Sequence, residues 1–186
     1  YGLLSYFSWG AGDIFGAIAA RKIGGFQTTF WIMIVASIIL LPFIPSQFGL
    51  LSEASVETIL VTILFGFLYQ SGNIAVSEAL KTTDASIVLT IMGTFGALVA
   101  LFSAVALHTP LTTYTVLCMI GISIGVFLVT RQETTIASQK KGVILSLYSA
   151  VSFGAFFTFG KYVSPILGWF WPIYLSFLWL PLLTLV

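Results

Sequence analysis

The chain has 186 residues, of which 59% are hydrophobic, 16% are aromatic and only 7% are Asp, Glu, Lys or Arg. Soluble domains carry about 25% charged residues, so a soluble fold of this length could not bury so much apolar surface. The net charge of +1 says nothing about partners, but the sequence has no basic patch for nucleic acid.

The charged residues fall between long apolar runs, and these runs define the predicted elements. A helix needs about 20 apolar residues to cross the hydrocarbon core, whereas barrel strands would be about ten residues long with alternating polarity. The runs are longer and apolar on all sides, so the sequence predicts an all-α integral membrane protein without a cleavable signal peptide. We expect seven transmembrane helices, near 3–20, 28–45, 58–78, 85–106, 112–130, 142–160 and 169–186.

The first predicted helix contains Asp13, the only Asp, Glu, Lys or Arg among the first twenty residues. A carboxylate at bilayer depth costs about 3 kcal/mol on insertion scales, and such a residue is by default a functional hypothesis. The alternative is that Asp13 accepts a hydrogen bond from a neighbouring helix and only holds the bundle together. Gly12 and Gly16 would let a second helix approach this one closely.

Polar residues at helical spacing occur in the first, third, fourth and sixth predicted helices. Tyr69 and Asn73 are four residues apart and share a helix face. We expect these helices to line a polar cavity, although hydroxyls and amides also join helices to one another, which is the alternative for any single residue. The candidate substrate-binding residues are Trp9, Asp13, Tyr69, Gln70, Asn73, Thr90, Thr94, Tyr148 and Ser152.

Glycines in the fourth and fifth predicted helices are also spaced for helix packing. Gly121 and Gly125 are four residues apart, and Gly93 and Gly96 are three apart. Small residues let helix backbones approach closely in a bilayer. We therefore expect the fifth helix to pack against a neighbouring helix or against another subunit of a homo-oligomer.

The remaining charged residues and the single cysteine suggest no chemistry. Glu78 and Lys81 are expected to pair at the membrane surface, and Lys161 to extend towards the interface. Cys118 lies alone within the fifth helix, so no disulfide can form within the chain. We find no cluster of His and acidic residues at metal-ligand spacing and no nucleophile beside a base, so the sequence predicts neither an enzyme nor a metal or cofactor.

The orientation in the membrane stays open. Basic residues in the loops after odd-numbered helices place those loops in the cytoplasm by the positive-inside rule. They are Arg21, Lys22, Lys81, Arg131, Lys140 and Lys141, against Lys161 alone after the even-numbered helices.

An internal repeat appears when the sequence is compared with itself at an offset of 140 residues. Arg21 then matches Lys161, Phe30 matches Phe170, and Trp31 matches Trp171. The first copy, 1–141, contains five predicted helices, and the second begins at 142 and reaches 186 with two. Because five is odd, the second copy enters the membrane from the opposite side, as in inverted-repeat transporters. We expect a truncated five-plus-five architecture of ten helices.

The same offset places Asp13 on Phe153. The second copy therefore has no matching acid, and any site between the copies must be asymmetric.

Three stretches resemble the drug/metabolite transporter superfamily in its EamA-type branch. They are Ser8-Trp9-Gly10 with Arg21-Lys22, the segment 78–86, and Leu111-Thr112 with 121–126. The chain departs from the family where Gly93-Thr94 replaces a usual Pro and Thr109 replaces a usual Glu. The resemblance implies five-plus-five helices around a cavity lined by helices one, three and four and their counterparts. It also implies that both termini are cytoplasmic, which opposes the charge bias.

These observations predict a multi-pass permease of the plasma or inner membrane that moves small organic metabolites or drugs by alternating access. Its partners would be the lipid bilayer and a small-molecule substrate, with Asp13 carrying a coupling proton or facing a substrate amine. The alternative is a membrane scaffold in which Asp13 and the glycines serve assembly. The sequence leaves open the substrate, the direction of transport and the energy source.

Overall fold

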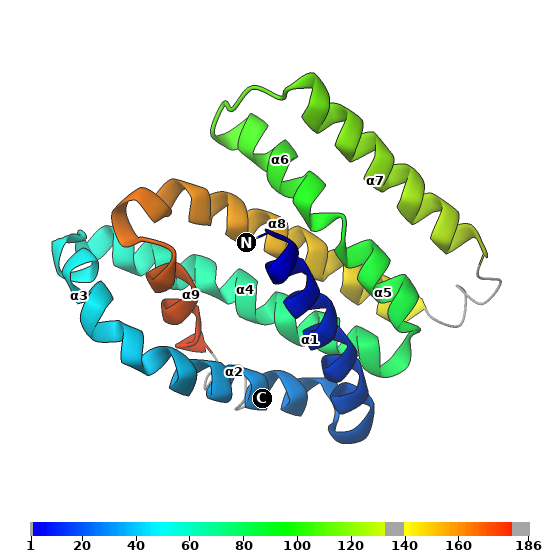
Figure 1. Cartoon of the computed structure of the whole chain (residues 1–186), viewed down its shortest axis with the longest axis horizontal. Helices are drawn as coiled ribbons and strands as arrows, with labels where there is room; N and C mark the ends of the chain where they lie inside the picture. Colours follow the sequence, from blue (N-terminus) through cyan, green and yellow to red (C-terminus); the bar gives the residue numbers. More distant parts are fainter. Residues whose placement is uncertain (1, 133–139, 180–186) are drawn as a thin grey trace.

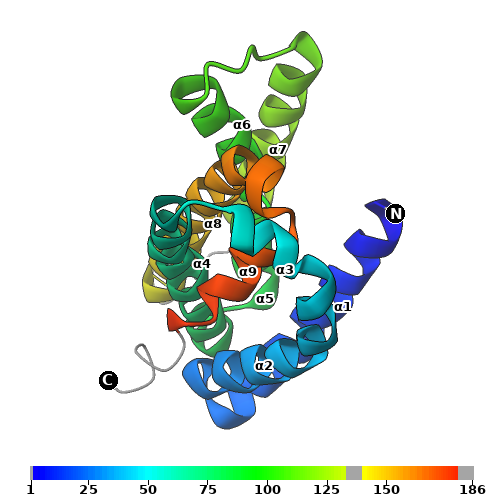
Figure 2. The same ribbon diagram turned by 90° about the vertical axis from the view of Figure 1, so that its left-hand side faces the viewer.

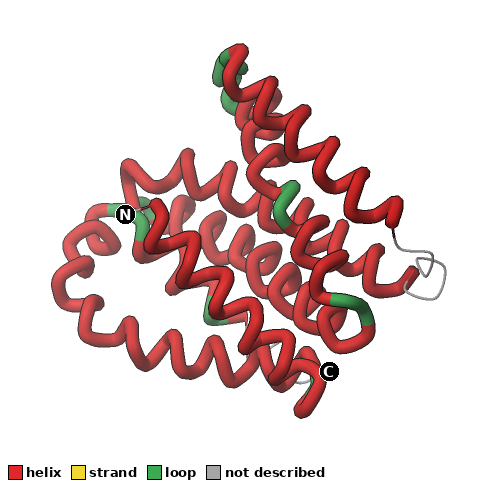
Figure 3. Tube along the Cα trace, turned by 45° about the vertical axis from the view of Figure 1, so that its right-hand side comes forward, coloured by secondary structure: helices red, strands yellow, loops and turns green. Residues whose placement is uncertain are grey.

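The computed structural model describes residues 2–132 and 140–179, with the side chains of 2, 5, 6 and 129–132 left aside. Within these ranges the regular structure is helical throughout (Figures 1 and 3). The helices are α1 (Gly2–Ile23), α2 (Gly25–Leu40), η1 (Leu41–Phe43), α3 (Ile44–Glu53), α4 (Val56–Thr82), α5 (Ala85–Met92), α6 (Phe95–Ala106), α7 (Thr113–Gln132), α8 (Lys140–Leu167) and α9 (Phe170–Ser176).

The predicted segments correspond to these helices, with corrected bounds. The second segment is longer than expected, because α2, η1 and α3 run almost continuously through Pro42 and Pro45. The fourth is interrupted at Gly93-Thr94, between α5 and α6. The seventh begins with the short α9, and the predicted remainder from 180 to 186 lies outside the described residues.

Four described segments are long and apolar enough to cross a membrane. They are Gly25–Glu53, Val56–Thr82, Ala85–Ala106 and Lys140–Leu167, and a shorter apolar helix covers Thr113–Leu128. In the described part of the chain, α1 and α9 do not reach this standard, since α1 contains Asp13 and serines and α9 has 7 residues. The chain is a polytopic helical membrane protein.

The antiparallel pair α4 and α8 forms the centre of the bundle (Figure 1). At Gly72 the side chains of α8 pack so close to the α4 backbone that a Cβ would lie 2.9 Å from Cε1 of Phe153. The buried hydroxyl of Ser149 donates a hydrogen bond of 2.8 Å to the Gly72 carbonyl. Phe65 and Phe159 continue the contact with stacked rings whose centroids are 4.1 Å apart.

The first two helices pack on the C-terminal half of α4. A cluster of small and apolar side chains joins α1 to α4, with Ala20 and Ala79 both completely buried. Gly24 turns the chain into α2 with a φ of 92°, a conformation that favours glycine. Thr29 then donates a 2.8 Å hydrogen bond to Ser77, and the Phe26 amide donates one of 3.0 Å to Glu78. Glu78 also pairs with Lys81 at 3.8 Å, as predicted.

The short helix α9 packs against the N-terminal half of α4. A Cβ at Gly66 would lie 2.7 Å from the Cα of Ser176. Beside it, the buried Nε2 of Gln70 donates a 3.3 Å hydrogen bond to Oγ of Ser176. Among the described residues the Oε1 of Gln70 has no partner. Gln70 therefore joins α4 to α9.

The glycines that we expected to mediate helix packing do not lie at the close contacts between described helices. A Cβ built at Gly12, Gly16, Gly121 or Gly125 would meet no described atom within 4 Å. Figures 1 and 2 show why for the last two, since α7 lies at the edge of the bundle and contacts only α5 and α6 appreciably. The tight contacts occur instead at Gly25, Gly66, Gly72, Gly142 and Gly154.

Successive helical segments alternate in direction, so α1 and α8 run oppositely (Figure 1). An inverted repeat of five segments requires this, but any series of helical hairpins would produce it too. The division into copies at residue 142 therefore stays a prediction.

The contact at Gly25 generates a stability prediction. A Cβ there would lie 2.4 Å from the Glu78 backbone nitrogen, and a backbone atom cannot rotate away. Gly25→Ala should therefore lower stability by about 1–3 kcal/mol, the usual cost of overpacking. Thermal unfolding of the purified protein measures this, with Gly121→Ala as the control because its Cβ would face open space. Equal melting temperatures for the two variants would contradict the α2–α4 contact.

The Gln70–Ser176 contact generates a second prediction. Ser176→Ala leaves the whole buried amide of Gln70 without its hydrogen-bond partner, which should cost about 1–3 kcal/mol. Gln70→Leu should cost less, because it removes the unpaired oxygen as well and Ser176 still donates to the Ile173 carbonyl. Thermal unfolding of the two single variants gives the order, and a larger loss in Gln70→Leu would count against it.

Candidate functional site

Two of the predicted binding residues, Tyr148 and Ser152, lie in the contact between α4 and α8. The Tyr148 hydroxyl donates a hydrogen bond of 2.8 Å to Ser71. Ser152 is 2% exposed and faces Gly72. Their contacts match the alternative role considered for such residues, which is to join one helix to another.

Gln70 donates its hydrogen bond to α9, and three more predicted residues donate to carbonyls of their own helical segments. The Asn73 amide donates a 2.8 Å hydrogen bond to the Tyr69 carbonyl one turn earlier. Thr90 and Thr94 donate to the carbonyls of Ser86 and Ile91 at 2.6 and 2.7 Å. Such local bonds satisfy a hydroxyl without any partner helix. No hydrogen bond between described residues joins Asp13, Asn73 and Thr90, which we expected to share one interior.

The break between α5 and α6 lies beside these residues. Gly93 bonds back to the Leu89 carbonyl and Thr94 to that of Ile91, after which the helix restarts at Phe95. The family usually places a Pro here, and the structure shows that Gly93-Thr94 produces an interruption without one. The first amides of a new helix have no partners within it and carry a partial positive charge.

Trp9, on the first helix, belongs to a group of aromatic rings from four helices. Its ring centroid lies 5.8 Å from that of Phe95 and 6.5 Å from that of Phe157. Tyr69 lies 5.6 Å from Phe153 and 6.4 Å from Phe157. We call Trp9, Tyr69, Phe95, Phe153 and Phe157 the aromatic cluster. It joins α1, α4, α6 and α8 at the level of the helix break.

Asp13 lies one turn after Trp9 on the same face of α1. Its side chain is exposed, because the N-terminal half of α1 diverges from the bundle (Figure 2). Among the described residues we find no hydrogen bond or ion pair formed by Asp13. The acid therefore has free acceptor capacity beside the aromatic cluster.

Three members of the aromatic cluster were missed by sequence reasoning. Phe95, Phe153 and Phe157 are hard to single out in a chain with 17 phenylalanines. Two features of the sequence could have pointed to them. Phe95 follows the Gly-Thr pair that stands where the resembled family has a Pro, and Phe153 matches Asp13 in the internal repeat.

The apolar grooves of the described chain lie away from these residues. One is bounded by α4, α6 and α8 on another side of the bundle, and a shallow one lies along α2. None of the nine predicted binding residues lines either groove. The described residues also include no group of three His, Cys, Asp or Glu side chains that could hold a metal ion.

Comparison with known proteins identifies the family. The sequence model of the EamA-like transporter family matches residues 1–131, which is most of the chain. Searches of curated proteins and of solved structures give no match. The match confirms the resemblance seen in the sequence, and the chain belongs to the EamA-like transporter family, whose members are membrane transporters.

Proposed function

We propose that this transporter moves a small organic metabolite or drug through a site formed by Asp13 and the aromatic cluster. The observation that carries the proposal is the position of Trp9. Its ring contacts Phe95 and Phe157, while Asp13 shares its helix face one turn away. Four helices that are separate in sequence thus meet at the aromatic cluster, and Asp13, one turn from Trp9, has no partner among the described residues.

The chemistry of this site suits an organic substrate with a cationic or amine group. Aromatic faces attract organic rings and cations, and the attraction to a cation reaches about 2 kcal/mol when it is desolvated. A carboxylate in an apolar setting is stabilised by a bound cation or by a proton, so the two ligands compete for it. Asp13 would thereby couple a proton to a substrate amine.

The broken fourth segment supports the same location. Binding sites in transporters are typically formed where transmembrane helices are discontinuous, near the bilayer midplane. The break at Gly93-Thr94 leads directly to Phe95 of the aromatic cluster. The mechanism would be alternating access, with two inverted repeats rocking around this site.

We also propose that the protein lies in the plasma or inner membrane, that its transport is coupled to protons, and that it forms a homo-oligomer. The competing proposal is a scaffold in which Asp13 serves assembly. Among the described residues no donor contacts Asp13, so the fold gives no support to a role of Asp13 in holding α1 to the other described helices.

Substituting Asp13 separates the two proposals. Asp13→Asn keeps the size of the side chain but removes its charge and its capacity to exchange a proton. Transport should fall to the background of cells lacking the protein, while membrane abundance stays unchanged. The measurement is efflux and uptake of a panel of labelled amines and neutral metabolites by cells that express the whole protein, with Glu57→Gln as a surface control. Normal flux at normal abundance would remove Asp13 from the mechanism.

The aromatic cluster should set substrate affinity. Phe157→Leu keeps an apolar side chain but removes the ring, which costs about 0.5–2 kcal/mol of cation attraction and so raises the apparent KM about two- to thirtyfold. Trp31→Leu, on the outer side of α2 and 58% exposed, is the matched control and should leave KM unchanged. Concentration-dependent flux measures both variants. Equal KM values for Phe157→Leu and the wild type would exclude the cluster from the site.

A further inference from the structure

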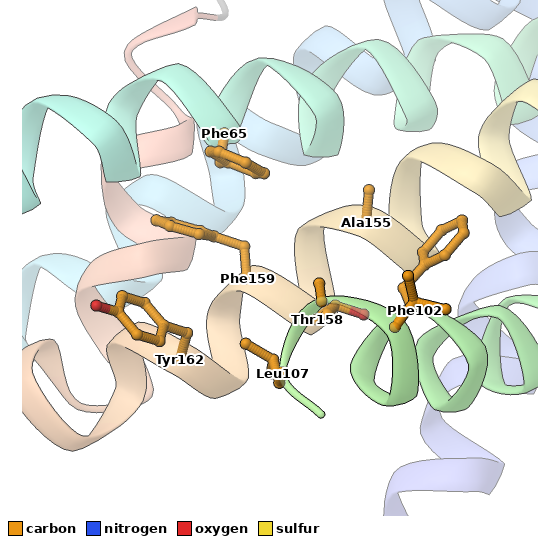
Figure 4. Close-up of a pocket in the computed structure, with 9 residues that line it drawn as sticks. Phe65, Phe102, Leu107, Ala155, Thr158, Phe159 and Tyr162 are labelled. Carbon is orange, nitrogen blue, oxygen red and sulfur yellow. The ribbon is translucent and has the colours of Figure 1, made fainter. Parts of the chain in front are cut away.

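An open apolar groove of about 550 Å³ lies between α4, α6 and α8 (Figure 4). Phe65, Phe159 and Tyr162 form one wall, and Phe102 of α6 and Leu107, directly after α6, form the other, with Ala155 between them. Thr158 also lines it, but its hydroxyl donates a 2.8 Å hydrogen bond to the Gly154 carbonyl. The groove therefore offers hydrocarbon contact along its length.

The groove faces away from the proposed transport site. On α8 its lining residue Ala155 and the aromatic-cluster residue Phe157 are two positions apart, which is about 200° around a helix. The rim is strongly exposed, since Val105 is 70% and Tyr162 62% accessible. Leu147 and Val151 continue this exposed face of α8 towards its start. Among the described residues this face of α8 is therefore uncovered, and it is turned away from the aromatic cluster.

One end of the groove is marked by the phenol of Tyr162. Lys161 precedes Tyr162 on α8, about 100° around the helix, and His108 follows the lining residue Leu107. Lys161 and His108 are exposed, and neither forms an ion pair among the described residues. The acids of that end of the bundle, Glu53 and Glu57, lie on the separate α3–α4 turn.

An apolar groove with a cationic end matches the charge pattern of an anionic phospholipid. We propose that the groove holds one acyl chain of such a lipid and that Lys161 binds its phosphate, with His108 and the Tyr162 hydroxyl beside it. A lysine near an anionic lipid surface contributes about 1 kcal/mol. The ordered lipid would fill the space between α6 and α8.

Native mass spectrometry of the purified whole protein tests the proposal. The probes are phosphatidylglycerol and phosphatidylcholine with identical acyl chains. The wild type should bind phosphatidylglycerol about fivefold more tightly, the effect of one lysine charge. Lys161→Gln should abolish that preference by weakening phosphatidylglycerol binding more than phosphatidylcholine binding, since both lipids carry a phosphate but only the first has a net negative charge. Ala155→Trp should fill the groove and reduce binding of both lipids.

Matched controls lie on the same helix. Lys140→Gln removes a charge at the opposite end of α8, and Leu147→Trp adds the same ring on its exposed face outside the groove. Both should bind lipid like the wild type, and circular dichroism checks that every variant is folded.

Three results would overturn the proposal. Equal wild-type affinity for the two lipids would mean that only non-specific boundary lipid is bound. An equal loss in Lys140→Gln and Lys161→Gln would mean a general charge effect. A dimer that Ala155→Trp dissociates would make the groove an interface between copies. If Ala155→Trp does not fold, the comparison of Lys161→Gln with Lys140→Gln decides.

Discussion

The close approach of α4 and α8 at Gly72 is the contact on which the remaining structure depends. Lipid is as apolar as the side chains, so helices in a bilayer associate through tight packing and through hydrogen bonds between them. Gly72 supplies the first by lacking a side chain opposite Phe153, and Ser149 supplies the second through the Gly72 carbonyl. The other contacts of α4, with α1, α2 and α9, and those of α8, with α5 and α6, are arranged around this pair.

Hydrogen bonding explains which polar side chains remain for a substrate. Unpaired polar groups are costly in hydrocarbon, so most hydroxyls here bond to the carbonyl one turn earlier or to a neighbouring helix. Ser37, Ser146 and Thr158 are examples, each donating to a carbonyl four residues before it. Asp13 differs from them, because no described donor meets it. The carboxylate of Asp13, which costs the most free energy to place in a bilayer, therefore remains able to bind a ligand.

Hydropathy was sufficient to predict the helical membrane fold, because apolar runs of helical length have few other solutions. It could not predict the break at Gly93-Thr94 or the joined α2–α3 segment, since both depend on local backbone geometry. The close contacts between described helices occur at other glycines than the spaced pairs, and packing of Gly121 and Gly125 against another subunit stays a prediction. Spacing shows that two glycines share a face, and it does not show whether a helix lies opposite that face.

The candidate site was predicted only in part. Trp9 and Tyr69 both contact Phe157, and Asp13 lies one helical turn from Trp9, while Gln70, Tyr148 and Ser152 are engaged in helix contacts. Polar side chains stand out in the sequence, because a polar atom is conspicuous in an apolar helix. A phenylalanine is not conspicuous there, and only the positions of Phe95, Phe153 and Phe157 in space distinguish them from the other phenylalanines.

The polar character of α1 also has a consequence for how the protein is made. Asp13 lowers the tendency of this helix to enter the bilayer by about 3 kcal/mol. The residues that hold α1 in place, such as Ala79 and Leu80, lie at the end of α4 and are synthesised some sixty residues later. During translation α1 therefore lacks its main stabilising contacts until α4 has been threaded into the membrane. We therefore expect stable insertion of α1 during biogenesis to depend on α4, which is synthesised later.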